Sequence, residues 1–235
     1  MRYFSLVCLL LGALFVVAGC DTTGIAEREI ERAAPRYIGP ADRYDADVVG
    51  LRQTTAQQVR LTGFGVRPAP NIVLRQLVLT LNDVEYQRDP FRITRIGSAL
   101  FSGQVTEQAA TAYLNARLAA NAQPIPLRNV QVTFLANQVR VTGTAVINGN
   151  ELPVTTTGIL QAQGQQVLYL PQQITVGDIA LGEQLRNAIA QGINPLFDLS
   201  QLAFTPLIQQ ITLQPGLLTI SGMADPAQLV RLMQE

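Results

Sequence analysis

Alternating apolar and polar residues between positions 58 and 101 predict a run of long β-strands. Residues 58–62 alternate strictly, and the pattern of residues 72–86 has the same period of two. In the longer segment two apolar sets alternate: Leu77, Leu79 and Leu81 on one face, and Leu74, Val78 and Val84 on the other. Both faces of this strand are then largely apolar, so we expect an apolar layer over each face of the sheet.

The remaining pattern predicts more strands and several short helices. Further strands are expected at residues 92–101, 130–134, 139–147, 152–160, 167–174, 208–213 and 217–221. Helices are expected at residues 25–34, from the N-cap Thr106 onward, along the stripe Leu181, Leu185, Ala188 and Ile189, and after the cap Asp225-Pro226. Turns are expected at residues 148–150, 163–165 and 215–216, and a loop around Asp42, Asp45 and Asp47. Pro35 and Gly39-Pro40 are expected to end the first helix.

Strands that follow one another with short turns, and only a few helices, predict an α+β protein with an antiparallel sheet. The mature chain is long enough for one large domain or two small ones, and we expect a single domain at residues 25–235. A strand-then-glycine pattern recurs about 80 residues apart, ending at Gly63, Gly143 and Gly222. This echo fits either repeated strand-and-helix units or the ordinary composition of strands.

The first residues have the layout of a secretory signal. Arg2 supplies a positive start, residues 6–17 are almost unbroken apolar, and Ala18-Gly19 precede Cys20. The apolar run is shorter than the ~20 residues that a spanning helix needs. Residues 17–20 resemble the bacterial lipobox, in which the cysteine takes a diacylglyceryl group before the leader is cut. We therefore expect a signal peptide at residues 1–19, lipidation of Cys20 and a tether at residues 20–24. The alternative is an uncleaved anchor with an incidental cysteine.

Composition excludes several kinds of chemistry. The chain has 17 basic residues, all arginine, against 17 acidic ones, and it contains no histidine, lysine or tryptophan. The absence of histidine removes the usual nucleophile pairs, and a single lipidated cysteine leaves only carboxylates as metal ligands. The absence of a basic block argues against nucleic acid as a partner. We expect neither an enzyme, a cofactor nor a metal site; a carboxylate pair acting on a glycan is a distant alternative.

Several short segments in a fixed order resemble the LmeA-like family of bacterial phospholipid-binding envelope proteins. The segments lie at residues 39–41, 83–86, 105–107, 152–154, 192–199 and 214–222, with Phe204 between the last two. This resemblance covers roughly residues 25–224. It implies a phospholipid ligand, no known catalysis, and a long curved antiparallel sheet packed with two or three helices, like tubular lipid-binding folds.

The predicted site is an apolar groove with one or two arginines at its mouth, because an acyl chain needs a dry surface and its phosphate a cation. For the groove we select Leu77, Leu79, Leu81, Phe101, Tyr113, Leu114, Ile193, Leu196 and Phe197. For the head group we select Arg75, Arg92 and Arg95. Periodicity alone does not separate such a groove from ordinary core.

The expected function is a lipoprotein in the bacterial cell envelope, anchored to a membrane and facing the periplasm or the exterior. It would bind phospholipid as a carrier or sensor. The alternative is a non-enzymatic scaffold that holds an envelope assembly and uses its anchor only for location.

Overall fold

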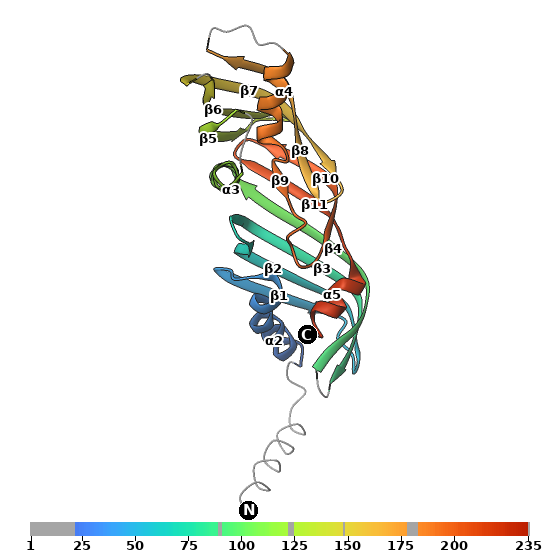
Figure 1. Cartoon of the computed structure of the whole chain (residues 1–235). Helices are drawn as coiled ribbons and strands as arrows, with labels where there is room; N and C mark the ends of the chain where they lie inside the picture. The colour runs from blue at the N-terminus through green and yellow to red at the C-terminus, as the bar shows by residue number, and fades with distance from the viewer. Residues whose placement is uncertain (1–21, 89–90, 122–124, 148, 178–182, 235) are drawn as a thin grey trace, which may run out of the picture.

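A computed structural model of the chain describes residues 22–234, apart from residues 89–90, 122–124, 148 and 178–182. The predicted leader, Cys20, Asn148 and Leu181 lie outside the described residues. The described part is built from two antiparallel sheets and four helices (Figure 1). This confirms the predicted α+β class with a curved antiparallel sheet, and the strands divide between two sheets.

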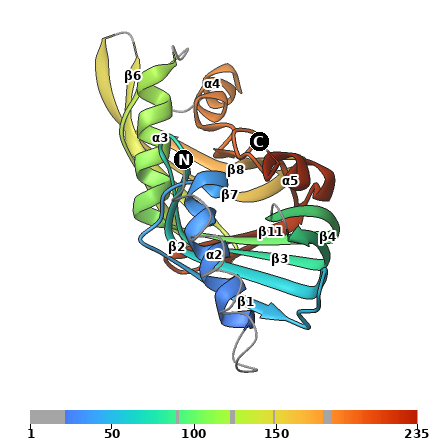
Figure 2. The same cartoon turned by 90° about the horizontal axis from the view of Figure 1, so that it is seen from below.

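The first sheet has six strands and is strongly curled into a half-barrel. In spatial order its strands are β1 (Arg43–Val49), β2 (Thr55–Ala69), β3 (Ile72–Arg88), β4 (Phe91–Thr106), β11 (Leu217–Ala224) and β10 (Pro206–Gln214). Viewed along the molecule, α2 lies across the open side of this half-barrel (Figure 2). The curled sheet therefore has a concave side, partly covered by helices, and a convex side.

The second sheet is the predicted meander. Its strands, in spatial order, are β5 (Leu127–Phe134), β6 (Val139–Ile147), β7 (Asn150–Gln163), β8 (Gln166–Val176) and the short β9 (Phe197–Asp198). It lies at the end of the molecule opposite α2 and β1 (Figure 1). The backbone N–H of Ile208 in β10 donates to the Gly164 carbonyl in the β7–β8 turn at 2.9 Å, which links the two sheets.

Four helices pack against these sheets: α2 (Thr22–Ile38), α3 (Glu107–Ala120), α4 (Glu183–Ile193) and α5 (Pro226–Leu232). The two predicted N-caps are confirmed, since Thr106 accepts from the N–H of Ala109 and Asp225 from that of Ala227. The helix predicted to start after Thr106 is α3, and the helical spacing of Ala110, Tyr113, Leu114 and Leu118 predicts the face that is buried. None of the helices in the described part of the chain is long and apolar enough to cross a membrane.

Two helices cover one edge strand of each sheet, β1 and β5, in the same way. On α2, Glu31 and Glu27 accept hydrogen bonds from the backbone N–H groups of Ala46 and Val48 in β1, at 2.9 and 3.1 Å. On α3, three side chains accept from β5: Glu107 from Phe134, Thr111 from Val132 and Asn115 from Val130. A helix rises about 6 Å over four residues and a strand about 6.6 Å over two, so the two ladders match. Edge N–H groups that would be open to another chain are thereby paired.

The two helices that bond to edge strands also begin the same order of elements. α2 is followed by the four-stranded run β1 to β4, and α3 by the four-stranded run β5 to β8. Gly63 lies in β2 and Gly143 in β6, each the second strand after its helix, whereas Gly222 lies in β11. The equivalent positions of the first two glycines favour repeated units over chance.

Two local expectations are wrong. The loop expected around Asp42, Asp45 and Asp47 is strand β1 from residue 43 onward, where the polar residues face solvent and Tyr44 and Val48 are buried. The first helix also ends later than the expected residue 34: α2 continues through Pro35 to Ile38 and ends at the expected Gly39-Pro40. The buried Ile38 anchors that last turn on the core, and this packing outweighs the cost of an internal proline.

The expectation of two apolar sheet faces is also wrong. Around Val78 the neighbours across the strands are Thr62, Ser102 and Ser221, so this convex row is polar. Leu74 was expected on the other face of the strand from Leu77. Gly103 pairs with Leu77 across the ladder, so a Cβ on Gly103 would point to the same face as Leu77. The Leu74 side chain lies 3.7 Å from that Cβ position. Leu74 and Leu77 therefore share the concave face. The strict alternation fails in this stretch, so the apolar layer covers one side only.

Candidate functional site

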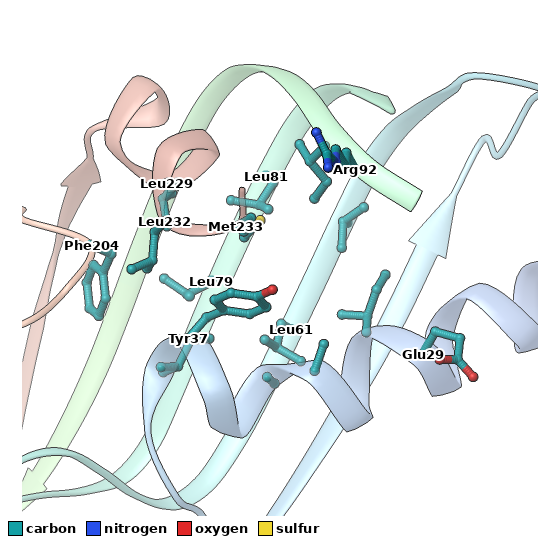
Figure 3. A pocket seen from close by; sticks show the side chains of 16 residues that line it. Glu29, Tyr37, Leu61, Leu79, Leu81, Arg92, Phe204, Leu229, Leu232 and Met233 are labelled. Carbon is teal, nitrogen blue, oxygen red and sulfur yellow. The ribbon is translucent and has the colours of Figure 1, made fainter. Parts of the chain in front are cut away.

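A largely apolar pocket of about 200 Å³ lies between α2, the concave face of the first sheet and α5. Figure 3 shows its side chains converging from these elements. The lining residues are Glu29, Ile30, Ala33, Ala34, Tyr37, Ile38, Val59, Leu61, Leu79, Leu81, Arg92, Ile93, Phe204, Leu229, Leu232 and Met233. Two of these sixteen are charged, so the interior suits an apolar ligand.

The floor of the pocket is a block of paired strand residues. Val59 lies opposite Leu81 and Leu61 opposite Leu79 in the β2–β3 ladder, and all four are at most 8% exposed. Residues spaced by two share one face of a strand, which places these four side chains together. The floor is therefore fixed by backbone hydrogen bonds.

The roof of the pocket comes from one stripe of α2. Ile30, Ala34, Tyr37 and Ile38 follow the spacing of a helix face, and Ala34 and Ile38 are buried. The small side chain of Ala34 leaves room between roof and floor. The roof is held mainly at its edge, where Glu27 and Glu31 bond to β1.

Phe204 closes the inner end of the pocket. Its ring is tilted against that of Phe101, with 5.9 Å between centroids, and Phe204 is only 1% exposed. In Figure 3, Glu29 and Arg92 lie on the side away from Phe204. The pocket is therefore apolar at its closed end and charged at the other.

The charged end holds one paired and one unpaired group. Glu29 forms an ion pair with Arg32 at 2.6 Å, and both side chains are mostly exposed. Within the described part of the chain, the Arg92 side chain has neither a hydrogen bond nor an ion pair, and the residue is exposed. Its five N–H donors are thus available for an anion at the mouth.

Three of the residues selected from the sequence line this pocket: Leu79, Leu81 and Arg92. Leu77 and Phe101 are buried on the same concave face without lining it. Arg75 is exposed elsewhere on β3, and Arg95 is paired with Glu85 at 2.7 Å. The structure therefore brings one of the three selected arginines to the pocket.

The other five selected residues do not line the pocket. Tyr113 and Leu114 come from α3, and the Tyr113 ring stacks on that of Phe197 at 5.2 Å. Ile193, Leu196 and Phe197 are at most 3% exposed, at the end of α4 and just beyond it. These five belong to tightly packed core between α3, α4 and the second sheet.

Arg117 holds this second core together. Its guanidinium donates to the carbonyls of Gly192 at 2.8 Å and Ile193 at 2.6 Å, and also to that of Pro195. These carbonyls lie at the C-terminal end of α4, where a cation is favoured. Burial lowers the pKa of Arg117 and raises that of Tyr113. The cluster has a structural role, because its donors are directed at backbone oxygens.

None of the residues that α2 and the C-terminal segment around α5 contribute to the pocket was among the site residues selected from the sequence. Tyr37 continues the apolar stripe of the first predicted helix, and Leu229, Leu232 and Met233 share one side of the predicted terminal helix, but neither stripe indicates a pocket. The available signal was the helical spacing of Ala26, Ile30, Ala33 and Tyr37, an apolar stripe that requires a surface to pack on. Phe204 was noted for the family resemblance and not for the pocket.

A curled antiparallel sheet with a helix closing an apolar pocket defines a class of proteins suited to holding a lipid chain. The comparison with family models agrees: the LmeA-like phospholipid-binding family matches residues 45–223, more than half of the 235-residue chain. The chain belongs to this family. Searches of curated proteins and of solved structures gave no match.

Proposed function

We propose that this protein is a lipid-anchored envelope protein that holds an acyl chain of a phospholipid in the pocket beneath α2. The head group would lie at the charged end, beside Arg92. The observation that carries the proposal is an almost wholly apolar pocket in a member of a phospholipid-binding family. At one end of this pocket lies Arg92, whose side chain has no partner among the described residues. Anchoring through Cys20 and exposure to the periplasm or exterior are part of the proposal.

The size of the pocket limits how much of a lipid it can hold. An apolar cavity of ~150 Å³ binds benzene, so 200 Å³ has room for roughly eight carbon atoms. At ~0.8 kcal/mol per buried methylene, eight carbons would contribute about 6 kcal/mol before ordering costs. A longer chain would require α2 to move outward or would leave part of its length outside. This limit favours partial, reversible binding, as a carrier or sensor requires.

Native mass spectrometry of detergent-free protein tests the proposal. We expect a co-purified phospholipid at near one per chain. A clean apo mass after exposure to vesicles of phosphatidylglycerol and phosphatidylcholine would reject it and favour the scaffold alternative.

A pocket-filling variant makes the test specific. Ala34→Leu adds a larger side chain to the roof and should remove the bound lipid without unfolding the domain, because filling a cavity stabilises by about 0.5–2 kcal/mol. Ala120→Leu, at an exposed position of α3, is the matched control and should keep its lipid. Equal lipid content in both variants would place the lipid outside this pocket.

A further inference from the structure

Two large apolar side chains are exposed at the end of the molecule where α2 begins. Ile25 in α2 is 53% exposed, and Val49, the last residue of β1, is 46% exposed. α2 runs antiparallel to β1, since Glu27 bonds to Val48 and Glu31 to Ala46. Ile25 precedes Glu27 and Val49 follows Val48, so the two exposed side chains lie at the same end of this helix–strand pair.

Arginines accompany this apolar pair. Arg28 and Arg52 are both exposed, and each lies three residues along the chain from one of the pair. The Arg28 side chain donates to the Gly24 carbonyl at 2.9 Å, within the first turns of α2. Apolar residues flanked by arginine are the composition of a surface that rests at a lipid–water interface.

The length of chain before α2 identifies what covers this surface. One residue separates Cys20 from Thr22, and five peptide steps separate Cys20 from Ile25. At 3.3–3.6 Å per residue, even a fully extended chain spans only about 18 Å. If Cys20 carries lipid, as the proposed function states, Ile25 is held close to the bilayer, and a bulky partner has little room between them.

The mouth of the pocket lies next to the same end. Glu29, at the charged end of the pocket, is four residues after Ile25, which is about 6 Å of helix rise. Tyr37 and Phe204, near the closed end, lie further from it (Figure 3). An acyl chain leaving the bilayer here would reach the pocket without crossing a wide layer of water.

We infer that the surface formed by Ile25, Val49, Arg28 and Arg52 docks on the phospholipid bilayer and directs the pocket mouth towards it. The inference rests on the proposed function. It adds an orientation: the first turn of α2 and the end of β1 face the membrane, and the second sheet points away from it.

Site-specific probes in the full-length lipidated protein test this orientation. Mature chains acylated on Cys20 have no free thiol, because Cys8 lies in the leader, so an introduced cysteine is labelled uniquely. Val49→Cys carries an environment-sensitive fluorophore, and Val73→Cys is the matched control. Val73 is 38% exposed and lies at the start of β3, towards the opposite end of the strands. Both proteins are reconstituted in 3:1 phosphatidylcholine–phosphatidylglycerol vesicles containing brominated acyl chains.

We expect quenching at position 49 to exceed that at position 73 by at least threefold. Equal quenching would overturn the inference. A blue shift at position 49 that depends on protein concentration, without quenching by brominated lipid, would assign the surface to a second copy of the chain and also overturn it.

Native mass spectrometry on the same samples separates this inference from the proposed function. Stoichiometric lipid with no excess quenching at position 49 would reject the docking surface alone. Strong quenching at position 49 with no bound lipid would reject the binding role and leave the docking surface standing. Val49→Asp should reduce the rate of lipid uptake from vesicles several-fold and leave the final lipid content unchanged.

Discussion

Glu31 on α2 accepts a hydrogen bond at 2.9 Å from the backbone N–H of Ala46 in β1. Through this bond and its neighbour from Glu27, the roof of the pocket is attached to the edge of the sheet that forms its floor. Edge strands left with free N–H groups invite pairing with other chains. The two glutamates therefore combine three roles: they accept from the edge N–H groups of β1, position α2 on the sheet and close the pocket.

Glu31→Ala should loosen α2 on the sheet. The substitution leaves the Ala46 N–H without its acceptor, which costs about 1–2 kcal/mol for a partly buried bond. We expect hydrogen exchange at Ala46 to accelerate by about tenfold. Glu29→Ala is the matched control, because in the described part of the chain the Glu29 carboxylate pairs with exposed Arg32 alone, and such pairs contribute about 0–1 kcal/mol. Equal exchange at Ala46 in both variants would contradict this role for Glu31.

Arg92→Gln should weaken retention of an anionic phospholipid. At the charged end of the pocket, the Arg92 guanidinium is unpaired among the residues that the structure describes. A charge-assisted contact to phosphate at an exposed site supplies about 1 kcal/mol, or roughly fivefold in affinity. Arg75→Gln removes the same charge at an exposed position that does not line the pocket. Competition between phosphatidylglycerol and phosphatidylcholine, read by mass spectrometry, checks the difference. The head-group assignment fails if both variants keep the wild-type preference.

The order of elements could be predicted from the sequence because most of it is set by local pattern. The meander of residues 130–174 alternates regularly and ends at turn residues, and the caps Thr106 and Asp225 have a local hydrogen-bonding cause. The strand state of β1 was not predicted, because its two buried residues, Tyr44 and Val48, are four positions apart among charged residues and do not show the period of two. Its strand state is fixed by pairing with β2 and by the carboxylates of α2, which are tertiary contacts.

The pocket was only partly predictable, because a cavity depends on how distant segments meet. Leu79 and Leu81 show as one face of a strand, but the same pattern describes any buried strand. Tyr113 and Phe197 look equally suitable by sequence, and they stack on each other in packed core. Phe204 lies more than 100 residues from Leu81, and only the fold brings it to the pocket. Periodicity identifies buried faces; it does not show where packing leaves a gap.

Gly222→Ala should destabilise the first sheet far more than Gly103→Ala, although the two glycines lie on adjacent strands. A Cβ on Gly222 would lie 2.0 Å from the Leu207 carbonyl oxygen, a backbone atom that can move only with strand β10. A Cβ on Gly103 would meet Leu74 at 3.7 Å, an ordinary contact. We expect the free energy of unfolding, measured in urea, to fall by roughly 2–3 kcal/mol in Gly222→Ala and by less than about 1 kcal/mol in Gly103→Ala. Similar losses in both variants would show that β10 does not approach β11 as described.

Two buried tyrosines should make the fold sensitive to alkali. Burial raises the pKa of Tyr44 and of Tyr169 to about 12, from about 10 in the unfolded chain. Tyr44 also donates to the Gly39 carbonyl at 2.7 Å, just beyond the end of α2. The folded state holds these two phenol protons more tightly than the unfolded state. Their contribution to the free energy of unfolding is therefore fully present below pH 10. It is lost as the pH rises from about 10 to about 12.

Tyr44→Phe separates this contribution from general alkaline unfolding. The variant loses the Gly39 hydrogen bond at every pH, so its free energy of unfolding should be lower at pH 9 by about 1 kcal/mol. Between pH 10 and 12 the free energy of unfolding should fall in both proteins. The fall should be smaller in the variant by on the order of 1–2 kcal/mol, because one titrating group has been removed. Urea unfolding at several pH values measures both effects. Parallel pH profiles for the two proteins would mean that Tyr44 ionises equally easily in the folded and unfolded chains. That result would contradict the burial of its ring beside the roof of the pocket.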